Sequence, residues 1–259
     1  MKISLITVCY NAEKTIADTI RSVFAQRCSH EIEYLIVDGA SKDGTLRVIE
    51  GLLKGREAAA GNVAARLISE PDRGMYDAIN KGIRLATGDI VGILNADDRF
   101  NGETILEQIA QAFAAQTELD CVYGDVRFVR GESPATARYY SSGGWRRWMH
   151  NWGYMPAHPT VYVRKGVFDR YGGYKLGYDI SADFEWMVRV FCRRRITARY
   201  LPLCMVTMRL GGKSTAGIKA MLKLNRENVR ANRENGYFCC LPMMGPKYLY
   251  KIWGYLIRR

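Results

Sequence analysis

The sequence predicts an α/β protein, a doubly wound and mainly parallel sheet with helices on both faces, followed by a C-terminal helical tail. Over the first 120 residues, apolar runs of strand length alternate with segments of helical periodicity, which is typical of this class. Residues 90–94 form a continuous apolar run, as expected for a central strand buried on both faces. A chain of 259 residues without internal repeats is long enough to bury one large core.

Each element follows from its local pattern. Apolar runs predict strands at residues 3–8, 34–37, 63–69, 90–94 and 120–126, and helical spacing predicts helices at 16–24, 46–53, 76–86 and 103–115. Beyond residue 126 the pattern loosens: residues 139–154 are expected to form a long ordered loop, and residues 164–171, 181–192 and 216–234 to be helical. Three tryptophans in that loop could fill a core or offer a platform for a sugar ring: Trp145, Trp148 and Trp152.

Charge is distributed unevenly along the chain. The net charge is +12, yet residues 1–120 contain 13 basic and 18 acidic side chains, which leaves 25 basic and 8 acidic side chains in residues 121–259. The second half therefore suits an anionic partner, either a phosphate-bearing substrate, an anionic membrane surface or a nucleic acid.

Cysteine usage and hydropathy indicate a reducing compartment. The seven cysteines are scattered and lack any Cys-x-x-Cys pair, so neither a disulfide framework nor a zinc site is expected. The N-terminal apolar run is too short for a signal peptide, and no stretch reaches the roughly 18 to 20 apolar residues of a membrane span. Residues 247–259, KYLYKIWGYLIRR, have the pattern of a helix lying in a membrane interface, although such a helix could equally dock on the protein's own core.

The clearest chemical signal is GDIVGILNADD, residues 88–98. It brings Asn95, Asp97 and Asp98 to the carboxyl end of a buried strand, where open α/β sheets bind ligands. Two adjacent carboxylates attract a hard cation such as Mg²⁺ or Mn²⁺, which needs few protein ligands when a phosphate-bearing substrate supplies others. The alternative is a solvated turn before the next helix.

Other strand ends carry related groups. Asp38, at the end of the second strand, could accept the imide N–H of a uracil while a tyrosine such as Tyr10 stacks on the ring, although Asp-Gly is also ordinary turn chemistry. In SEPDRGMYDAINKG, residues 69–82, Arg73 and Lys81 could hold a diphosphate.

Together ITVCYN, VDGASKDGT, SEPDRGMYDAINKG and ATGDIVGILNADD resemble the family-2 glycosyltransferases, which have a nucleotide-binding A-type fold and invert the transferred sugar. The resemblance covers residues 2–126 closely and continues less tightly to about residue 215. It implies a uridine pocket, donor contacts and a metal-and-donor motif in which Asp98, with Asp97, holds the metal. The corresponding residues are Thr7, Tyr10, Asn11 and Asp38 for uridine, Asp72 and Lys81 for the donor, and Asn95, Asp97 and Asp98 for the metal motif.

In the basic half, ISADFEW resembles the family segment that holds the catalytic base. Asp183 corresponds to the base, and Ala182 replaces the Glu that many relatives have before it. Glu185 and Trp186 fit the family pattern on the acceptor side. His158 resembles an acceptor-side position, but a structural loop histidine is the preferred interpretation; Asp183 could alternatively cap its helix.

The resemblance implies an inverting glycosyltransferase that uses Mn²⁺ or Mg²⁺ and moves a sugar from a nucleotide donor, UDP being favoured, to a glycan or polyprenyl-pyrophosphate-linked precursor. We expect a glycosyltransferase domain over residues 1–215, divided into a nucleotide-sugar-binding half (1–126) and an acceptor-side half (127–215), and a basic helical extension over 216–259. A cytoplasmic protein at the inner face of the cell membrane is expected, with an anionic membrane surface as a partner and no nucleic acid.

Two alternatives stay open at this point. A sugar nucleotidyltransferase would use a related sheet, but its Gly-rich phosphate loop should follow the first strand, where this chain has Cys9, Tyr10 and Asn11. A nucleic-acid-binding protein would explain the basic second half but would have no use for the Asp97–Asp98 pair.

Overall fold

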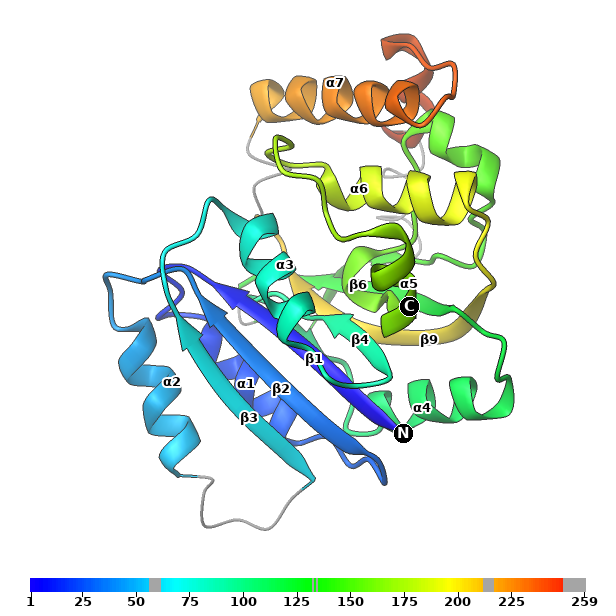
Figure 1. The fold of residues 1–259 in the computed structure, drawn as a ribbon. Coiled ribbons are helices and arrows are strands. Elements are labelled where there is room, and N and C mark those ends of the chain that lie inside the picture. The colour runs from blue at the N-terminus through cyan, green and yellow to red at the C-terminus, as the bar shows by residue number, and fades with distance from the viewer. Residues whose placement is uncertain (56–61, 132, 134, 212–216, 249–259) are drawn as a thin grey trace.

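The fold is a nine-stranded sheet with helices on both faces, seen in a computed structural model that describes residues 1–55, 62–131, 133, 135–211 and 217–248 (Figure 1). The first four strands are parallel throughout: β1 (Lys2–Cys9) lies between β2 (Glu31–Asp38) and β4 (Ile90–Ile93), and β3 (Val63–Ser69) forms the edge beside β2. The predicted parallel core is therefore confirmed.

The remaining five strands extend this sheet with mixed pairing. The sheet order continues from β4 through β8 (Tyr162–Arg164), β6 (Cys121–Val129), β9 (Ala198–Arg209) and β5 (Arg99–Phe100), and β7 (Thr136–Tyr140) pairs with β6. β6 and β9 are parallel, whereas β8, β7 and β5 join by short antiparallel pairs. The sequence did not predict β5, β7, β8 or β9: β5, β7 and β8 are short, and the apolar residues of β9 are interrupted by Pro202 and flanked by Arg199 and Arg209.

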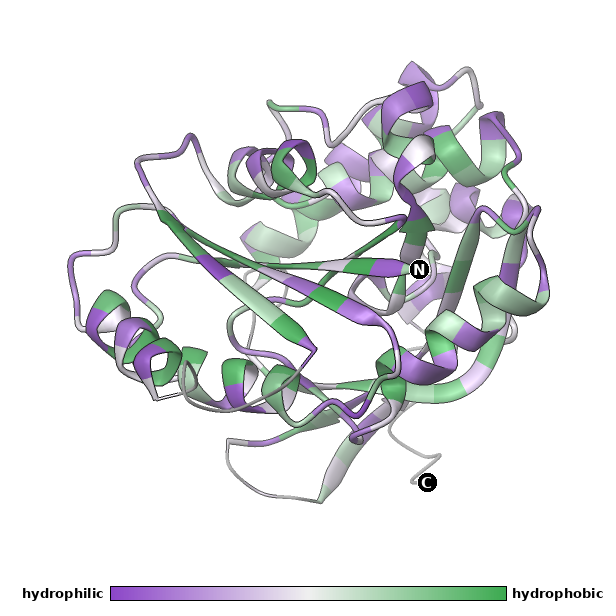
Figure 2. Ribbon diagram, turned by 60° about the horizontal axis from the view of Figure 1, so that its bottom comes forward, coloured by the Kyte–Doolittle hydropathy of each residue, from purple (hydrophilic) through white to green (hydrophobic). Residues whose placement is uncertain are grey.

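The helices form two layers against the sheet. One face carries α1 (Ile16–Phe24), α2 (Thr45–Lys54) and α4 (Ile105–Ala115), and the other carries α3 (Met75–Leu85), α5 (Lys165–Tyr171) and α6 (Ala182–Met187), which continues as one π-helical turn over Val188–Arg193. In Figure 2 the strands are mainly hydrophobic, whereas hydrophobic and hydrophilic residues alternate along the helices. α7 (Ile218–Glu234) packs on the outer side of α6, away from the sheet (Figure 1).

The expected loop over residues 139–154 is partly wrong. β7 ends at Tyr140 and a 3₁₀ helix, η1, spans Arg147–Trp152. Trp145 is buried in the core and donates its Nε1–H to the Tyr154 carbonyl (3.3 Å), whereas Trp148 is 55% exposed. The core interpretation therefore holds for Trp145 and not for Trp148.

Part of the predicted C-terminal region lies outside the described residues. Two 3₁₀ turns complete the described elements, η2 (His158–Thr160) and η5 (Leu241–Met244). Residues 249–259, which make up most of the predicted tail helix, lie outside the described part of the chain. Of the helices that are described, none combines the length and apolar character needed to cross a bilayer.

Candidate active site

The carboxyl ends of β1, β2, β3 and β4 meet at one edge of the sheet, and hydrogen bonds join the loops that follow them (Figure 1). Asp38, fully buried at the end of β2, accepts hydrogen bonds from the Ser69 hydroxyl (2.7 Å), the Ser41 N–H (3.0 Å) and the Ser41 hydroxyl (2.5 Å). The Asp38 carboxylate thus holds together the ends of two strands, directly beneath the edge where a nucleotide was predicted.

Two residues predicted to contact the nucleotide have structural roles here. The Thr7 side chain is fully buried, and its hydroxyl accepts a hydrogen bond from Tyr34 (3.1 Å), so Thr7 faces the core rather than the sheet edge. Asn11 connects two loops: its N–H donates to the Ser41 hydroxyl (2.8 Å), and its Oδ1 accepts from the Lys42 N–H (2.9 Å). Asn11 has φ of 51°, a left-handed conformation that asparagine tolerates better than most residues.

Tyr10 and Asp72 lie next to each other over Gly39. Tyr10 is 58% exposed, and a Cβ atom added to Gly39 would lie 2.4 Å from Asp72 Oδ2 and 3.5 Å from the Tyr10 ring. Lys81 lies behind this pair, with its ammonium group 2.6 Å from the Pro71 carbonyl oxygen and 3.0 Å from the Glu70 carboxylate. An aromatic face and a carboxylate are therefore presented together, and Lys81 supports the loop that carries Asp72.

The acidic pair after β4 combines one buried and one exposed carboxylate. Asp98 is 2% exposed and Asp97 is exposed; the Asn95 amide donates to Asp98 Oδ2 (2.9 Å). Burial, together with the charge of Asp97, raises the pKa of Asp98 well above its usual range. A cation beside Asp98 would offset both causes.

This donor set fits a hard divalent cation. Asp97 and Asp98 offer carboxylate oxygens, which Mg²⁺ and Mn²⁺ prefer. Within the described residues no cluster of three or more His, Cys, Asp or Glu side chains could hold a metal ion. A cation held by Asp97 and Asp98 would therefore leave most of its coordination positions to water and a phosphate-bearing ligand.

Asp183 lies across from these loops, at the start of α6, and contacts the first half through Tyr76. The Tyr76 hydroxyl, near the start of α3, donates to the Ile180 carbonyl (2.6 Å) and to Asp183 Oδ1 (3.1 Å). Asp183 keeps partial solvent exposure, and desolvation raises its pKa, although the charge of His158 opposes this. The N-cap residue of α6 is Ser181 and not Asp183, which argues against the helix-cap interpretation.

Two further aromatic side chains complete the surroundings of Asp183. The Tyr174 ring stacks on Tyr76 (centroids 5.8 Å apart), and its hydroxyl lies 2.8 Å from His158 Nε2. Burial lowers the pKa of His158 and so favours the neutral imidazole, although the negative charge of Asp183 acts in the opposite direction. His158 is thus close enough to Asp183 to interact electrostatically, while its ring is held by Tyr174.

Glu185 and Trp186, predicted on the acceptor side, instead lie in the interior. Both side chains are fully buried. Glu185 pairs with Arg189 (3.0 Å) and Lys175 (3.1 Å); burial opposes its ionisation, but the Arg189 hydrogen bond and charge outweigh that effect and lower its pKa. Trp186 stacks on Phe168 and donates to the Gly172 carbonyl (3.0 Å). These two residues support α6 from the interior, and neither side chain is exposed to solvent.

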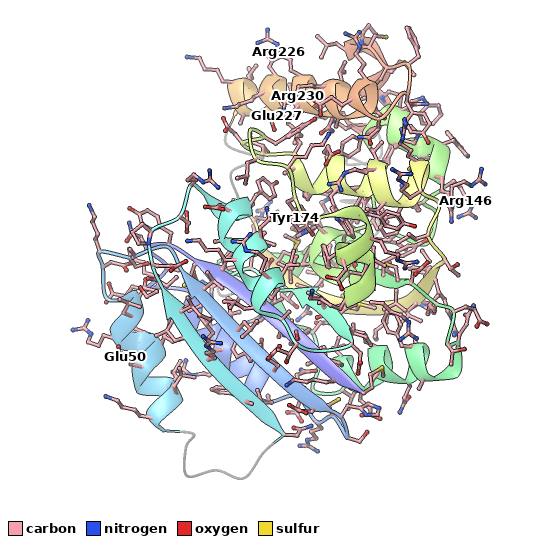
Figure 3. All side chains as sticks on the ribbon, in the orientation of Figure 1. Glu50, Arg146, Tyr174, Arg226, Glu227 and Arg230 are labelled. Atoms are coloured by element: carbon pink, nitrogen blue, oxygen red, sulfur yellow. The ribbon has the colours of Figure 1, made fainter. Side chains whose placement is uncertain are left out.

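The residues that connect α7 and α3 to this region were not predicted from the sequence. Glu227 of α7 is 7% exposed and accepts hydrogen bonds from the backbone N–H groups of residues 179, 180 and 181 (3.0, 3.0 and 2.9 Å). Asn80 pairs with both backbone groups of Tyr174 (2.7 and 2.8 Å). Figure 3 shows Glu227 on the side of α7 that faces the rest of the protein, and Tyr174 between the two halves. Only the motif SEPDRGMYDAINKG, which contains Tyr76 and Asn80, offered a signal for any of them.

Comparison with known families agrees with this arrangement. The family described as glycosyl transferase family 2 matches residues 4–178, more than half of the chain. This protein belongs to glycosyl transferase family 2 and is a glycosyltransferase. The family assignment favours glycosyl transfer over both alternatives, the nucleotidyltransferase and the nucleic-acid-binding protein.

Individual relatives are distant. An uncharacterized glycosyltransferase of Mycobacterium tuberculosis is 29% identical over 194 residues, which cover 72% of this chain and 68% of the relative. A PGL/p-HBAD biosynthesis glycosyltransferase of Mycobacterium bovis is 29% identical over 200 residues, which cover 76% of this chain and 73% of the relative.

Solved structures of two proteins share the fold. Residues 1–349 of TarS from S. aureus, in complex with UDP-GlcNAc, match with a TM-score of 0.66 at 17% identity over 98% of this chain and 73% of that one. In another TarS 1–349 structure the match spans 65% of that chain. The mannosyltransferase PcManGT from Pyrobaculum calidifontis, in complex with GDP-Man and Mn²⁺, matches with a TM-score of 0.66 at 16% identity over 98% of this chain and 72% of that one.

Proposed function

We propose that this protein is an inverting glycosyltransferase that transfers a sugar from a nucleotide donor, preferably a UDP-sugar, with Asp183 as the base. The observation that carries this proposal is the Tyr76–Asp183 hydrogen bond (3.1 Å), which fixes a carboxylate of the second half against the helix that follows the donor loops. The Asp183 carboxylate therefore lies near the edge that carries Tyr10 and Asp72 without belonging to it.

Donor binding is proposed for the strand-end loops. Tyr10 offers an exposed ring for the base, while Asp38 and Asn11 set the shape of the loops beneath it. Asp72 is proposed to contact the donor directly, and Lys81 to act through the loop that carries Asp72. The relatives crystallised with UDP-GlcNAc and with GDP-Man support a nucleotide-sugar donor.

Mn²⁺ or Mg²⁺ is proposed at Asp98 and Asp97, with Asn95 orienting Asp98 through its amide. When bound, such a cation would stabilise the negative charge that develops on the leaving nucleotide diphosphate. The raised pKa of Asp98 supports this assignment, because a buried carboxylate next to a second one is poorly compensated by the protein alone.

Inversion requires the acceptor hydroxyl to attack from the side opposite the leaving group, with a base positioned to take its proton. One oxygen of Asp183, Oδ1, is held by Tyr76 and the Phe184 N–H (2.8 Å). Among the described residues no other side chain is hydrogen-bonded to Oδ2, so that oxygen can accept the proton. The raised pKa of Asp183 brings the group closer to the working pH, which strengthens it as a base.

The acceptor is proposed to be a glycan or a polyprenyl-pyrophosphate-linked precursor, reached by a cytoplasmic protein at the inner face of the membrane. The support is the charge of residues 121–259, which contain 25 basic and 8 acidic side chains. We propose that residues 1–126 bind the donor, residues 127–215 face the acceptor, and residues 216–259 form the basic extension.

The direct test is calorimetric titration of UDP into the full chain with and without Mn²⁺, followed by a hydrolysis screen of nucleotide sugars. We expect UDP to bind in a metal-dependent manner and one nucleotide sugar to be hydrolysed preferentially. UDP binding that is indifferent to the metal would contradict the metal assignment, and hydrolysis of no nucleotide sugar would contradict the donor class.

A further inference from the structure

The outer face of α7 is cationic and apolar at once. Its exposed side chains recur at helical spacing along one stripe, and the chain after α7 adds two exposed apolar side chains. Four apolar members are strongly exposed: Ile218 (73%), Leu222 (44%), Phe238 (80%) and Leu241 (47%). The basic members are Lys219, Arg226 and Arg233, all exposed. We call these seven residues the α7 ridge.

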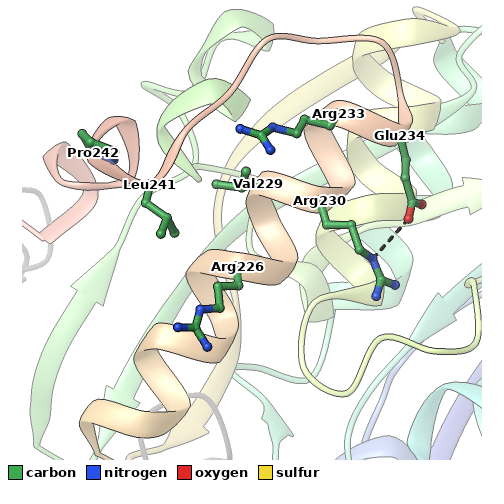
Figure 4. Close-up of a pocket in the computed structure, with 7 residues that line it drawn as sticks. All are labelled: Arg226, Val229, Arg230, Arg233, Glu234, Leu241 and Pro242. Carbon is green, nitrogen blue, oxygen red and sulfur yellow. Dashed lines mark ion pairs between the residues drawn. The ribbon is translucent and has the colours of Figure 1, made fainter.

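A surface hollow lies along the ridge. It has a volume of about 580 Å³ and is lined by Arg226, Val229, Arg230, Arg233, Glu234, Leu241 and Pro242. Figure 4 shows the Arg226 and Arg233 side chains on either side of Val229, with Leu241 beside it. The hollow therefore presents guanidinium groups around an apolar floor.

Among the described residues, two of the three guanidinium groups that line the hollow, those of Arg226 and Arg233, have no acidic partner. Glu234 is the one acidic side chain among the described lining residues, and it is already paired with Arg230 (3.1 Å) and Lys175 (2.9 Å). Arg233 donates to the Cys239 carbonyl (2.9 Å), a neutral group. Within the described part of the chain, Arg226 has no ion-pair partner. A ligand for this face must thus be anionic.

We propose that the α7 ridge docks on an anionic phospholipid bilayer, with the guanidinium and ammonium groups at the lipid phosphates and the four apolar side chains at the headgroup boundary. Exposed apolar side chains surrounded by Lys and Arg are typical of protein surfaces that bind in the plane of the membrane–water interface. The proposal deepens the proposed function, on which it rests for a lipid-linked acceptor, by naming the surface that meets the membrane.

Charge complementarity argues against the other occupants. A second copy of this chain would bring an equally cationic ridge. The segment 249–259 contains Lys251, Arg258 and Arg259 and no acidic side chain, so it is repelled by the same groups. An anionic bilayer attracts both the ridge and that segment.

α7 also connects the ridge to the segment before Asp183, residues 177–181. Besides Glu227, Lys223 pairs with Asp179, and Arg230 donates to the Gly177 carbonyl (3.0 Å) while its guanidinium lies 3.7 Å from the centre of the Tyr178 ring. One helix thus holds the segment before Asp183 on one side and presents the ridge on the other. Docking of the ridge would therefore orient Asp183 relative to the membrane plane.

The test is co-sedimentation of the full chain with vesicles of phosphatidylcholine alone or mixed with phosphatidylglycerol, at low and high salt. The variant Lys219→Glu/Arg226→Glu reverses two ridge charges. Since each basic group near an anionic surface contributes about a factor of five in binding, we expect the partition coefficient to fall by at least roughly thirtyfold. The control Lys54→Glu/Arg66→Glu makes the same change in net charge at exposed positions of α2 and β3.

A second variant, Leu222→Ser/Phe238→Ser, tests the apolar part and should weaken binding at high salt, where screening leaves the apolar contribution. Equal binding by the ridge variants and the wild type would overturn the proposal, as would equal losses in the Lys54/Arg66 control. Tighter vesicle binding by a chain that ends at Tyr248 would show instead that residues 249–259 cover the ridge, and a change of oligomeric state without vesicles would indicate self-association. UDP binding by the same variants reports on the proposed function separately.

Discussion

Replacing Glu227 with Gln should displace the segment that positions Asp183, although Glu227 touches neither predicted substrate. Its carboxylate accepts three backbone N–H groups: Glu227 Oε1 takes one, from Asp179, and Oε2 takes two, from Ile180 and Ser181. A glutamine can keep its oxygen at the position that serves two of them. Its NH₂ group then faces the third N–H, and two donors cannot bond to each other.

The magnitude follows from these three bonds. Leaving a poorly solvated N–H without an acceptor costs about 1–3 kcal/mol, and the two remaining bonds lose the strengthening due to the negative charge. Since Glu227 is only 7% exposed, solvent recovers little of this. We expect about 3 kcal/mol of destabilisation, which corresponds to roughly 6–12 °C in Tm for a chain of this size. Even a small displacement of a catalytic group can cost about a hundredfold in rate, so kcat should fall by about ten- to a hundredfold.

Scanning calorimetry and the kinetics of nucleotide-sugar hydrolysis measure the two effects. The affinity for UDP should stay unchanged, because Glu227 contacts the Asp183 segment and not the strand-end loops. Glu50→Gln, the same substitution on the exposed surface of α2, serves as the control (Figure 3). A Glu227→Gln protein with the Tm and kcat of the wild type would refute the positioning role, and a loss of UDP affinity would place the effect elsewhere.

Three further substitutions test the site. Because the pKa of Asp98 is raised in the folded state, the folded protein binds more protons than the unfolded protein, and ionisation of Asp98 costs stability as pH rises above about 4. Asp98→Asn should therefore raise the Tm of the metal-free protein at neutral pH but not at pH 3. Added Mn²⁺ should raise the Tm of the wild type and not that of the variant. Gly39→Ala would push the Asp72 carboxylate aside, so calorimetry should show UDP affinity reduced several-fold at nearly unchanged stability. Tyr76→Phe removes a hydrogen bond that favours ionised Asp183, so the acidic limb of the pH–kcat profile should move to higher pH. If the limb does not move, the group that titrates there is not Asp183.

The first half of the fold could be predicted because its signals are local. The strand over residues 90–94 is a continuous apolar run that ends in charged residues, and the helices before and after it have clear apolar faces. The short strands β5 and β8 are different. β8 has three residues and β5 has two, and their pairing is antiparallel with strands distant in sequence. Such pairing is a tertiary effect that no short window contains.

The candidate site was also only partly predictable from the sequence. The order of motifs singled out Asp98 and Asp183 as candidates, but nothing in the sequence distinguishes an exposed carboxylate from a buried one. Glu185, two residues after Asp183, lies on another face of α6 and is neutralised by Arg189 and Lys175. Glu227 belongs to a helix whose sequence is typical of a basic surface helix. The three backbone N–H groups that it binds lie more than 40 residues earlier in the sequence. Contacts of this kind can be found only from the folded chain.

The central claim, that Asp183 is the base of this glycosyltransferase, is tested most directly by Asp183→Asn. The rate of sugar release from the preferred nucleotide sugar and the affinity for UDP with Mn²⁺ are measured side by side, with Asp169→Asn, an exposed carboxylate of α5, as the control. We expect the rate to fall by about a hundredfold to ten-thousandfold for Asp183→Asn, with UDP affinity unchanged and the control near the wild type. An Asp183→Asn protein that releases sugar at the wild-type rate would contradict the account.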